Sequence, residues 1–494
     1  MRRRSFLAGG LALGSLPLVG RRAHAGSLWG EAPSGWADLI PGEGSRAERM
    51  LEIFCYGGCS FYDTFYVVEE FGEEEGTGWH LHSDDHVRVF GSLCDMDEKN
   101  WLTPFATDAN GHQVHLGPAL QPLVQRPDIL ARTRIIVTAH DQLPHQTAVP
   151  LMITGKSLGN PRAAGFGAHV SRFWRDRSDS VLPMAYVLAP STASNMYPSR
   201  AVGAHPASAR PLGVTVTSNS DLVERLQRLP LGDRRETLDA LVSHYMSELQ
   251  GRYTHSEAGL LRSTALDDHD FALQALQSGP ELAELLGPNF LRSMDLRVCG
   301  TYQHDYPTGN GIRSAIELLL NPGLDTRHCM VADMGFGDAG SYDSHGGDHT
   351  QDQTLNLYAA LATLAALVNE PGEGDDGKLD LDDTMVVIST EFGRTITEEY
   401  DTRPGSTGHH PDGFVTVVIG GAITEAEAGL YGAIDADGVA TDYISPSELR
   451  AGLLVGMGIN PFMDEAFGVA DVENATSEEG ATEWLLEHVL GRTA

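Results

Sequence analysis

The segment between His328 and Phe414 contains the motifs His328-Cys-Met-Val-Ala-Asp-Met-Gly-Phe-Gly337, Ser341-Tyr-Asp-Ser-His345, Thr384-Met-Val-Val-Ile-Ser-Thr-Glu-Phe-Gly-Arg394 and Gly408-His-His-Pro-Asp-Gly413. Its apolar, β-branched runs predict buried strands, and acids, imidazoles and glycines follow where the strands end. Polar residues at the carboxyl ends of strands are typical of the binding crevice of an open α/β sheet. Carboxylates and imidazoles are also common ligands of divalent metals. The segment therefore predicts a metal-assisted hydrolytic site.

The same alternation of strands and helices extends through most of the chain. Further strands are predicted at 51–56, 134–139, 182–188, 212–217 and 414–419, and helices at 148–154, 312–320, 352–368, 447–457 and 482–490. This order favours an α/β sandwich in which helices flank a largely parallel sheet. Apolar residues recur at helical spacing between about residues 221 and 295, which predicts a helical insertion.

The beginning of the chain has the features of an export signal. Arginines at positions 2 to 4 precede a glycine-interrupted apolar run, and Ala23-His-Ala25 is a small-x-small cleavage motif. Arg3-Arg4-Ser-Phe-Leu7 fits the twin-arginine pattern. We expect residues 1–25 to be removed, residues 26–50 to form a surface lead-in and residues 51–494 to form the folded domain. The mature protein is then periplasmic or secreted, and no later run has the ~20 apolar residues of a membrane span.

The chain is strongly acidic. Its 34 lysines and arginines against 68 aspartates and glutamates give a formal net charge of −34. A field of this sign argues against nucleic acid or an anionic membrane as the partner. It also repels phosphate and sulfate esters, so that such substrates require a metal ion or a local arginine to offset it.

The cysteines exclude a dense disulfide framework. There are five, at Cys55, Cys59, Cys94, Cys299 and Cys329, and they are scattered. One pair could form in an oxidising compartment. A metal site made of four cysteines is not supported by this spacing.

Two further strand ends carry candidate site residues. The predicted strand 51–56 ends in Gly57-Gly58, where glycine lets the backbone approach a ligand closely. Asp63 follows, either as a ligand or as a helix cap. The predicted strand 134–139 leads into His140-Asp-Gln-Leu-Pro-His-Gln-Thr147, which forms a second site segment.

These motifs resemble, in their order, the domain of unknown function 1501 family. The resemblance rests on the twin-arginine start, Gly57-Gly58, Leu116-Gly-Pro-Ala-Leu, the segment 145–155, Tyr342-Asp-Ser-His345, Glu391-Phe-Gly-Arg-Thr395 and Gly408-His-His410. That family is grouped with the alkaline phosphatase and sulfatase superfamily. The resemblance implies an alkaline-phosphatase-like sandwich and a divalent-metal site that acts on phosphate or sulfate esters.

The resemblance also implies roles for individual residues. Asp343 and His345 match the superfamily's Asp and His on one metal, Glu391 matches an acidic ligand, and His409 or His410 matches the late histidine ligand. Asp63 is the acidic residue nearest to the double glycine, because Ser60 occupies the usual place. Phe392 stands where a second histidine ligand is usual. His145 falls near the place of the nucleophile, and Thr147 is the nearest hydroxyl.

Elementary chemistry suggests what such a set would do. A divalent ion, zinc first and otherwise manganese, iron or calcium, would lower the pKa of water and polarise an ester oxygen. Arg394 would hold anionic oxygens in a fork, or would instead form a buried ion pair with Glu391. His145 would act as ligand, base or covalent nucleophile.

We therefore expect an exported, metal-dependent hydrolase of phosphate, sulfate or related esters, which acts on a small-molecule or polymer substrate. One alternative is a non-catalytic exported binding protein with the same fold, whose ligand is a surface polymer or a partner protein. Another is a single-metal enzyme that acts on a different substrate through a bound water.

Overall fold

A computed structural model describes most of the predicted domain. The described residues are 28–72, 102–160, 164–175, 177–178, 180, 182–189, 307–335, 342–345, 349–398, 406–463 and 466–492, with short pieces at 212–215, within 237–248, and at 279–285, 295–298 and 302–305. The predicted signal at 1–25 lies outside them, as does most of the predicted insertion at 221–295.

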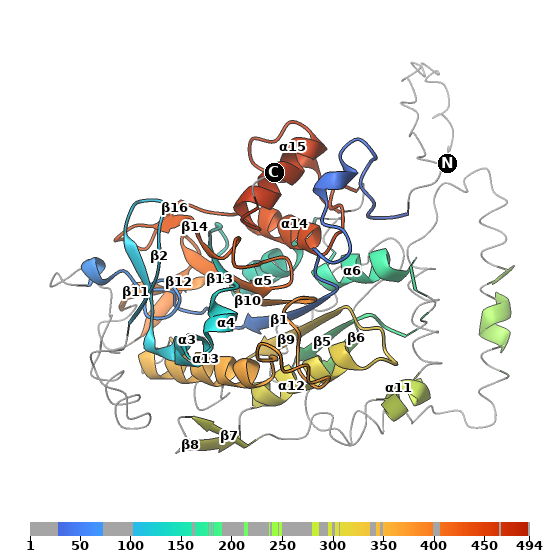
Figure 1. The fold of residues 1–494 in the computed structure, drawn as a ribbon, viewed down its shortest axis with the longest axis horizontal. Helices are drawn as coiled ribbons and strands as arrows, with labels where there is room; N and C mark the ends of the chain where they lie inside the picture. The colour runs from blue at the N-terminus through green and yellow to red at the C-terminus, as the bar shows by residue number, and fades with distance from the viewer. Residues whose placement is uncertain are drawn as a thin grey trace, which may run out of the picture.

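A sheet of eight strands forms the centre of the fold, in the order β14-β4-β13-β10-β1-β9-β5-β6 (Figure 1). Its strands are β1 (Arg49–Cys55), β4 (Thr133–Thr138), β5 (Ala185–Ala189), β6 (Leu212–Thr215), β9 (His328–Asp333), β10 (Thr384–Thr390), β13 (Phe414–Gly420) and β14 (Gly429–Tyr431). Six of these strands, β1, β4, β5, β9, β10 and β13, are almost wholly buried, as expected for strands covered on both faces, and β4, β10 and β13 are rich in β-branched residues.

The sheet is largely parallel, as the sequence predicts. Strand β1 pairs in parallel with β9 and β10, β5 pairs in parallel with β9 and β6, and β14 pairs in parallel with β4. Only β13 runs the other way among these eight strands, antiparallel to both β4 and β10. Its first residue, Phe414, therefore pairs with the last residue of β4, Thr138, so that the chain entering β13 lies at the carboxyl edge of the parallel strands.

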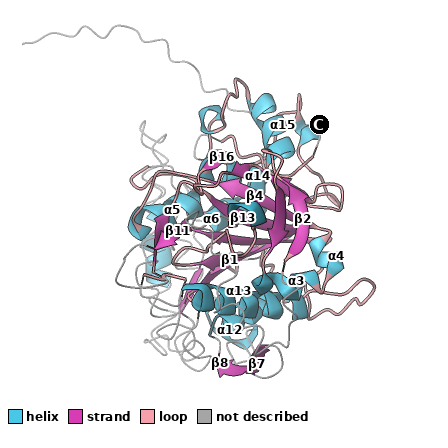
Figure 2. Cartoon of the chain, turned by 90° about the vertical axis from the view of Figure 1, so that its left-hand side faces the viewer, coloured by secondary structure: helices cyan, strands magenta, loops and turns pink. Residues whose placement is uncertain are grey.

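Helices cover both faces of the sheet (Figures 1 and 2). One face carries α3 (Gln121–Val124), α4 (Pro127–Leu130), α12 (Pro307–Leu320) and α13 (His349–Ala366), and the other carries α5 (His145–Thr154), α6 (Phe166–Arg175), α14 (Pro446–Gly456) and α15 (Glu478–His488). The helix α14 begins with a full capping box between Ser445 and Glu448, which explains its sharp start. None of the helices among the described residues is long and apolar enough to cross a membrane.

Smaller elements surround this core. They are the 3-10 helices η1 (Ala37–Leu39), η2 (Glu69–Phe71), η5 (Pro118–Leu120) and η8 (Val469–Asp471), the helix α11 (Gly279–Leu285), and the strand pairs β2 (Thr103–Thr107) with β3 (Gln113–Leu116), β7 (Asp295–Val298) with β8 (Tyr302–Asp305), β11 (Gly393–Glu398) with β12 (Thr407–His410), and β15 (Ala433–Ile434) with β16 (Ala440–Asp442). The pair β11–β12 matters most here, because it brings the segments after β10 and before β13 together.

A buried ion pair ties the central strand to the helices above it. Glu52 in β1 accepts hydrogen bonds from both terminal nitrogens of Arg450 in α14, at 2.6 and 2.9 Å. The Arg450 Nε donates to the carbonyl of Met152 in α5, and the Ser389 hydroxyl in β10 donates to Glu52 at 2.7 Å. Burial alone would raise the pKa of Glu52, but Arg450 and His328 outweigh burial and hold it well below its usual value.

Candidate metal centre

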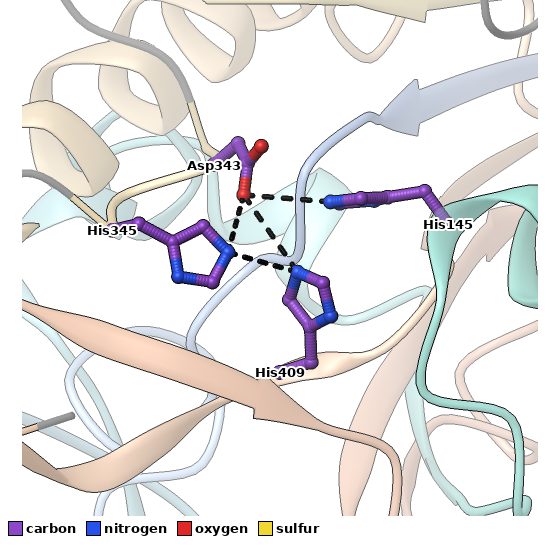
Figure 3. A group of neighbouring side chains, drawn as sticks. All are labelled: His145, Asp343, His345 and His409. Carbon is purple, nitrogen blue, oxygen red and sulfur yellow. Dashed lines mark hydrogen bonds and ion pairs between the residues drawn. The ribbon is translucent and has the colours of Figure 1, made fainter.

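Four side chains from three distant segments meet at the carboxyl edge of the sheet (Figure 3). His145 is the first residue of α5, which follows β4 after a short loop. Asp343 and His345 lie between β9 and α13, and His409 lies in β12, just before the antiparallel strand β13. The ligand atoms of the four residues all lie within 4.8 Å of one another.

The Oδ1 atom of Asp343 is the centre of this group. It lies 3.2 Å from Nε2 of His345, 3.5 Å from Nε2 of His145 and 3.9 Å from Nε2 of His409. Two ligands of a tetrahedral zinc ion are roughly 3.3 Å apart, since Zn–N bonds are about 2.0–2.1 Å. The spacing of the four atoms therefore fits one divalent ion.

Hydrogen bonds on the far side of two rings turn their Nε2 atoms inward. The Nδ1 of His145 lies 2.7 Å from Oε1 of Glu391, and the Nδ1 of His409 lies 2.8 Å from the carbonyl oxygen of Leu143. An acceptor at Nδ1 keeps the proton there and leaves Nε2 for a metal, as in carboxylate–histidine–metal arrangements. Glu391 is fully buried and also accepts the Gly57 amide at 2.8 Å, so that its position is well determined.

The charge state of the group also fits a cation. Burial by itself would lower the pKa of His145, but Asp343 and Glu391 outweigh it and raise the pKa to about 9. Desolvation likewise opposes ionisation of Asp343, yet His145, His409 and Arg394 hold its pKa far below the usual range. The His145 Nε2 is buried and makes no well-formed hydrogen bond among the described residues. A metal ion would replace the proton on this atom.

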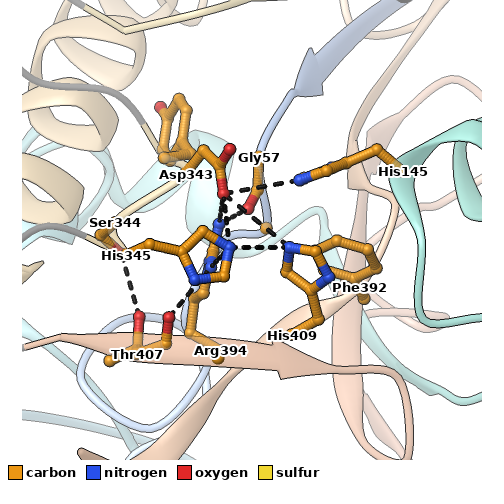
Figure 4. Close-up of polar contacts among 12 residues, drawn as sticks. Gly57, His145, Asp343, Ser344, His345, Phe392, Arg394, Thr407 and His409 are labelled. Atoms are coloured by element: carbon orange, nitrogen blue, oxygen red, sulfur yellow. Dashed lines mark hydrogen bonds and ion pairs between the residues drawn. The ribbon is translucent and has the colours of Figure 1, made fainter. Parts of the chain in front are cut away.

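Arg394 closes the group from inside the protein (Figure 4). Its side chain is fully buried, and its Nη2 donates to Oδ1 of Asp343 and to the carbonyl of Gly57. Its Nη1 donates to the carbonyl of Thr407 at 3.2 Å and lies 3.4 Å from Nε2 of His345. Burial lowers the pKa of Arg394, and the neighbouring carboxylate of Asp343 opposes this effect. In this position Arg394 holds Asp343 and is not exposed to solvent.

The Gly57-Gly58 loop packs directly against the group. Both residues have positive φ, +117° and +100°, which side-chain-bearing residues rarely adopt. A Cβ atom on Gly57 would overlap the backbone of Asp343, and one on Gly58 would lie 2.9 Å from the Nε atom of Arg394. The glycine backbone therefore approaches the residues of the site itself, the backbone of Asp343 and the side chain of Arg394.

The remaining predicted site residues lie around the group rather than in it. Glu391 contacts His145, as described above. His410 points its Nε2 at the carbonyl of Gly438, 2.7 Å away. Asp63 is buried and accepts the Ser60 hydroxyl, and burial raises its pKa to about 6. The Thr147 hydroxyl donates to the carbonyl of Pro144, at 3.0 Å, in the first turn of α5.

The pairing of β11 with β12 explains why His409 and not His410 joins the group. Arg394 pairs with His409 and Gly393 pairs with His410. Because successive side chains in a strand point to opposite faces, the pair that contains Arg394 faces Asp343 and the other does not. The ring of Phe392 stacks on His409, with centroids 4.3 Å apart, and so takes part as a packing residue.

Sequence reasoning did not find two backbone contributions. The carbonyl of Leu143 orients His409, and the carbonyl of Gly57 anchors Arg394. Every residue has a carbonyl, so the sequence contains no signal for these contacts. His140, in the predicted second segment, binds the carbonyl of Glu391 through Nε2 at 2.6 Å, and burial lowers its pKa.

The fold and this group define a mixed α/β protein with a candidate metal centre at the carboxyl edge of its sheet. The chain belongs to the family described as protein of unknown function (DUF1501), whose model matches residues 47–468. This match includes all four residues of the group and confirms the family that the motifs resemble. A search of curated proteins found no match.

Proposed function

We propose that the group His145, Asp343, His345 and His409 binds one divalent metal ion, with zinc as the first choice, and that the protein hydrolyses phosphate, sulfate or related esters there. The observation that carries the proposal is the convergence of three imidazoles and one carboxylate within 4.8 Å. Imidazole and carboxylate are ligands that suit zinc, and His145 and His409 have supporting partners at Nδ1.

Each residue of the site would have a separate role in metal binding or substrate access. A bound divalent ion supplies Lewis acidity, which polarises an ester oxygen and lowers the pKa of coordinated water. Glu391 orients His145, and Arg394 holds Asp343 while it offsets part of the negative charge of the site. The side chains of Asp343 and His345 are 36% and 35% exposed, so a substrate would approach from their side.

The proposal also includes an alkaline-phosphatase-like fold and export by the twin-arginine route. The parallel sheet with a metal group at its carboxyl edge supports an alkaline-phosphatase-like sandwich. The arginines at positions 3 and 4 support export by the twin-arginine route to the periplasm or medium.

Export is tested by replacing both arginines with lysine and measuring the amount of the protein in each cell fraction. Precursor that stays in the cytoplasm is the expected result, and unchanged export argues against this route.

Elemental analysis tests the metal site. The purified wild-type protein should contain close to one equivalent of metal after reconstitution with zinc. Replacing His409 with Ala, or Asp343 with Asn, should remove it, because the first change deletes one ligand and the second replaces a carboxylate ligand with a neutral amide, which is not a usual zinc ligand. His410→Gln is the matched control, since it changes the adjacent histidine while retaining a group that can bind the Gly438 carbonyl.

The outcomes separate the alternatives. Metal that is lost in the two ligand variants and kept in His410→Gln supports the site and leads to a screen of phosphate and sulfate esters. Metal lost in His410→Gln but kept in His409→Ala would instead favour His410 as the ligand. A wild-type protein that binds no metal after reconstitution would contradict the proposal.

A non-catalytic binding role remains the second candidate, and two observations favour it. The Thr147 hydroxyl is bonded to the Pro144 carbonyl at the start of its own helix, and Arg394 is fully buried and does not face solvent as a substrate clamp would. Metal-loaded protein that hydrolyses none of the screened esters but captures a polymer or a partner protein would support this role.

A further inference from the structure

The loop that supports the metal group begins and ends with a cysteine. Cys55 is the last residue of β1 and Cys59 follows Gly57-Gly58. Both thiols are free and buried, and the residues are 0% and 9% exposed. The Thr390 hydroxyl closes the loop, because it donates to the carbonyl of Cys55 at 2.8 Å and accepts the amide of Cys59 at 3.1 Å.

The side chains of Cys55 and Cys59 are neighbours, because both ends of this loop are bound to the one Thr390 hydroxyl. The pKa of Cys55 is raised well above its usual value, first by the side-chain contact with Cys59 and then by burial. Two backbones held by one hydroxyl place the two side chains near each other, as a short-loop disulfide requires.

The same loop is bonded to the metal group through its backbone. The Gly57 amide donates to Glu391, which orients His145, and the Gly57 carbonyl accepts from Arg394, which holds Asp343. The Gly58 carbonyl accepts from Gln353 at 2.9 Å. A movement of this loop would therefore reach two of the four proposed ligands.

We propose that Cys55 and Cys59 form a dithiol–disulfide site, and that its oxidation weakens metal binding at the group above it. A disulfide holds its sulfurs about 2 Å apart, which is closer than two unbonded thiols can approach, so oxidation draws the loop ends together. This shifts Gly57 relative to Glu391 and Arg394. The coupling to metal binding rests on the proposed function, whereas disulfide formation itself does not.

The oxidant is a small-molecule disulfide such as glutathione disulfide. The thiolate of Cys59, the more exposed of the two, attacks one sulfur of the oxidant and releases one thiolate. The Cys55 thiol then loses its proton, attacks the mixed disulfide at Cys59 and releases the second thiolate. Two protein thiols are oxidised to one disulfide, and the oxidant is reduced to two thiols.

The experiment treats folded, metal-free protein with glutathione disulfide or with a reductant. Mass spectrometry of the peptide that contains residues 55–59 detects the loss of two hydrogens on disulfide formation. Competition with a chelator measures the affinity of the protein for zinc. We expect an intramolecular disulfide and a zinc affinity lowered at least about 10-fold, the lower end of the effect of losing a supporting partner. Addition of the reductant should restore the affinity.

Variants identify the thiols responsible. Cys59→Ser and Cys55→Ala should each abolish both responses, and the less buried Cys59 gives a usable variant if Cys55→Ala folds poorly. Cys329→Ser changes another buried cysteine, in β9, and should keep both responses.

The readouts keep the two proposals apart. Thiols that stay free in folded protein overturn the dithiol site, whatever the metal does. A disulfide that forms without a change in zinc affinity overturns the coupling. Reduced protein that binds no zinc contradicts the proposed function and with it the coupling, while the mass change still shows whether the disulfide forms.

Discussion

Glu391 supports the metal group without belonging to it. It is fully buried, and its Oε1 binds both the Nδ1 of His145 and the Gly57 amide. Carboxylates in this position set the tautomer of the ligand histidine and raise its basicity.

Glu391→Gln should therefore lower zinc affinity about 10–100-fold while the protein stays folded. The change keeps the size of the side chain but removes its charge, so the measurement is zinc affinity by chelator competition beside a thermal unfolding curve. An affinity that equals the wild-type value would show that Glu391 has no supporting role. Loss of the fold would show that the residue is mainly structural.

The helix α6 contains a buried histidine that responds to acid. His169 is 2% exposed, stacks on Trp29 and packs against Phe467. Burial, aided by nearby Lys156, lowers its pKa to about 4. The folded protein thus binds fewer protons than the unfolded chain below the usual histidine pKa of about 6.5. The contribution of His169 to stability is complete above that pH and is lost as the pH falls towards 4.

His169→Gln, which carries no titrating group, should lose less stability than wild type between pH 7 and pH 4.5. The difference should reach about 2.5 kcal/mol at pH 4.5, which lies about two units below 6.5, because one pKa unit is about 1.4 kcal/mol. Denaturant unfolding at several pH values measures it. Parallel pH profiles for the two proteins would contradict the assignment.

The packing of α14 and α5 on β1 is stabilised by the buried Glu52–Arg450 ion pair. Arg450→Met leaves the Glu52 charge buried without this partner and removes the bond to the carbonyl of Met152. Breaking such a pair costs about 3–5 kcal/mol. The double variant Glu52→Gln/Arg450→Met should recover part of this cost, since no unpaired charge remains. Chemical denaturation measures the free energy of unfolding of each variant. A double variant that is less stable than Arg450→Met would contradict this explanation.

The whole molecule carries a formal charge of −34, which favours solubility but opposes compactness. Salt screens this repulsion, with a Debye length of about 30 Å at 0.01 M and about 8 Å at 0.15 M. The melting temperature should therefore rise over this range of sodium chloride at pH 7. The rise should shrink as the pH approaches the sequence pI of about 4.8. A melting temperature that falls with salt would mean that attractive ion pairs dominate.

The sequence by itself determined seven of the eight sheet strands, all but β14, most of the longer flanking helices, though not α6, and the edge at which the candidate site lies. Runs such as 384–390 and 328–332 are apolar over the length of a strand, and polar residues follow them, so local pattern was sufficient. The motifs also identified the family, and they offered Asp343, His345 and one of His409 and His410 as candidate metal ligands. For His145, the sequence left open the roles of ligand, base and nucleophile.

Only the tertiary structure decided which of the candidates meet. The choice between His409 and His410 depends on the register of β11 with β12, which strand pairing sets and local sequence does not. The place of Glu391 behind His145 and the burial of Arg394 depend on contacts between segments hundreds of residues apart. Contacts at such separations are made by packing of the whole sheet, and no local pattern encodes them.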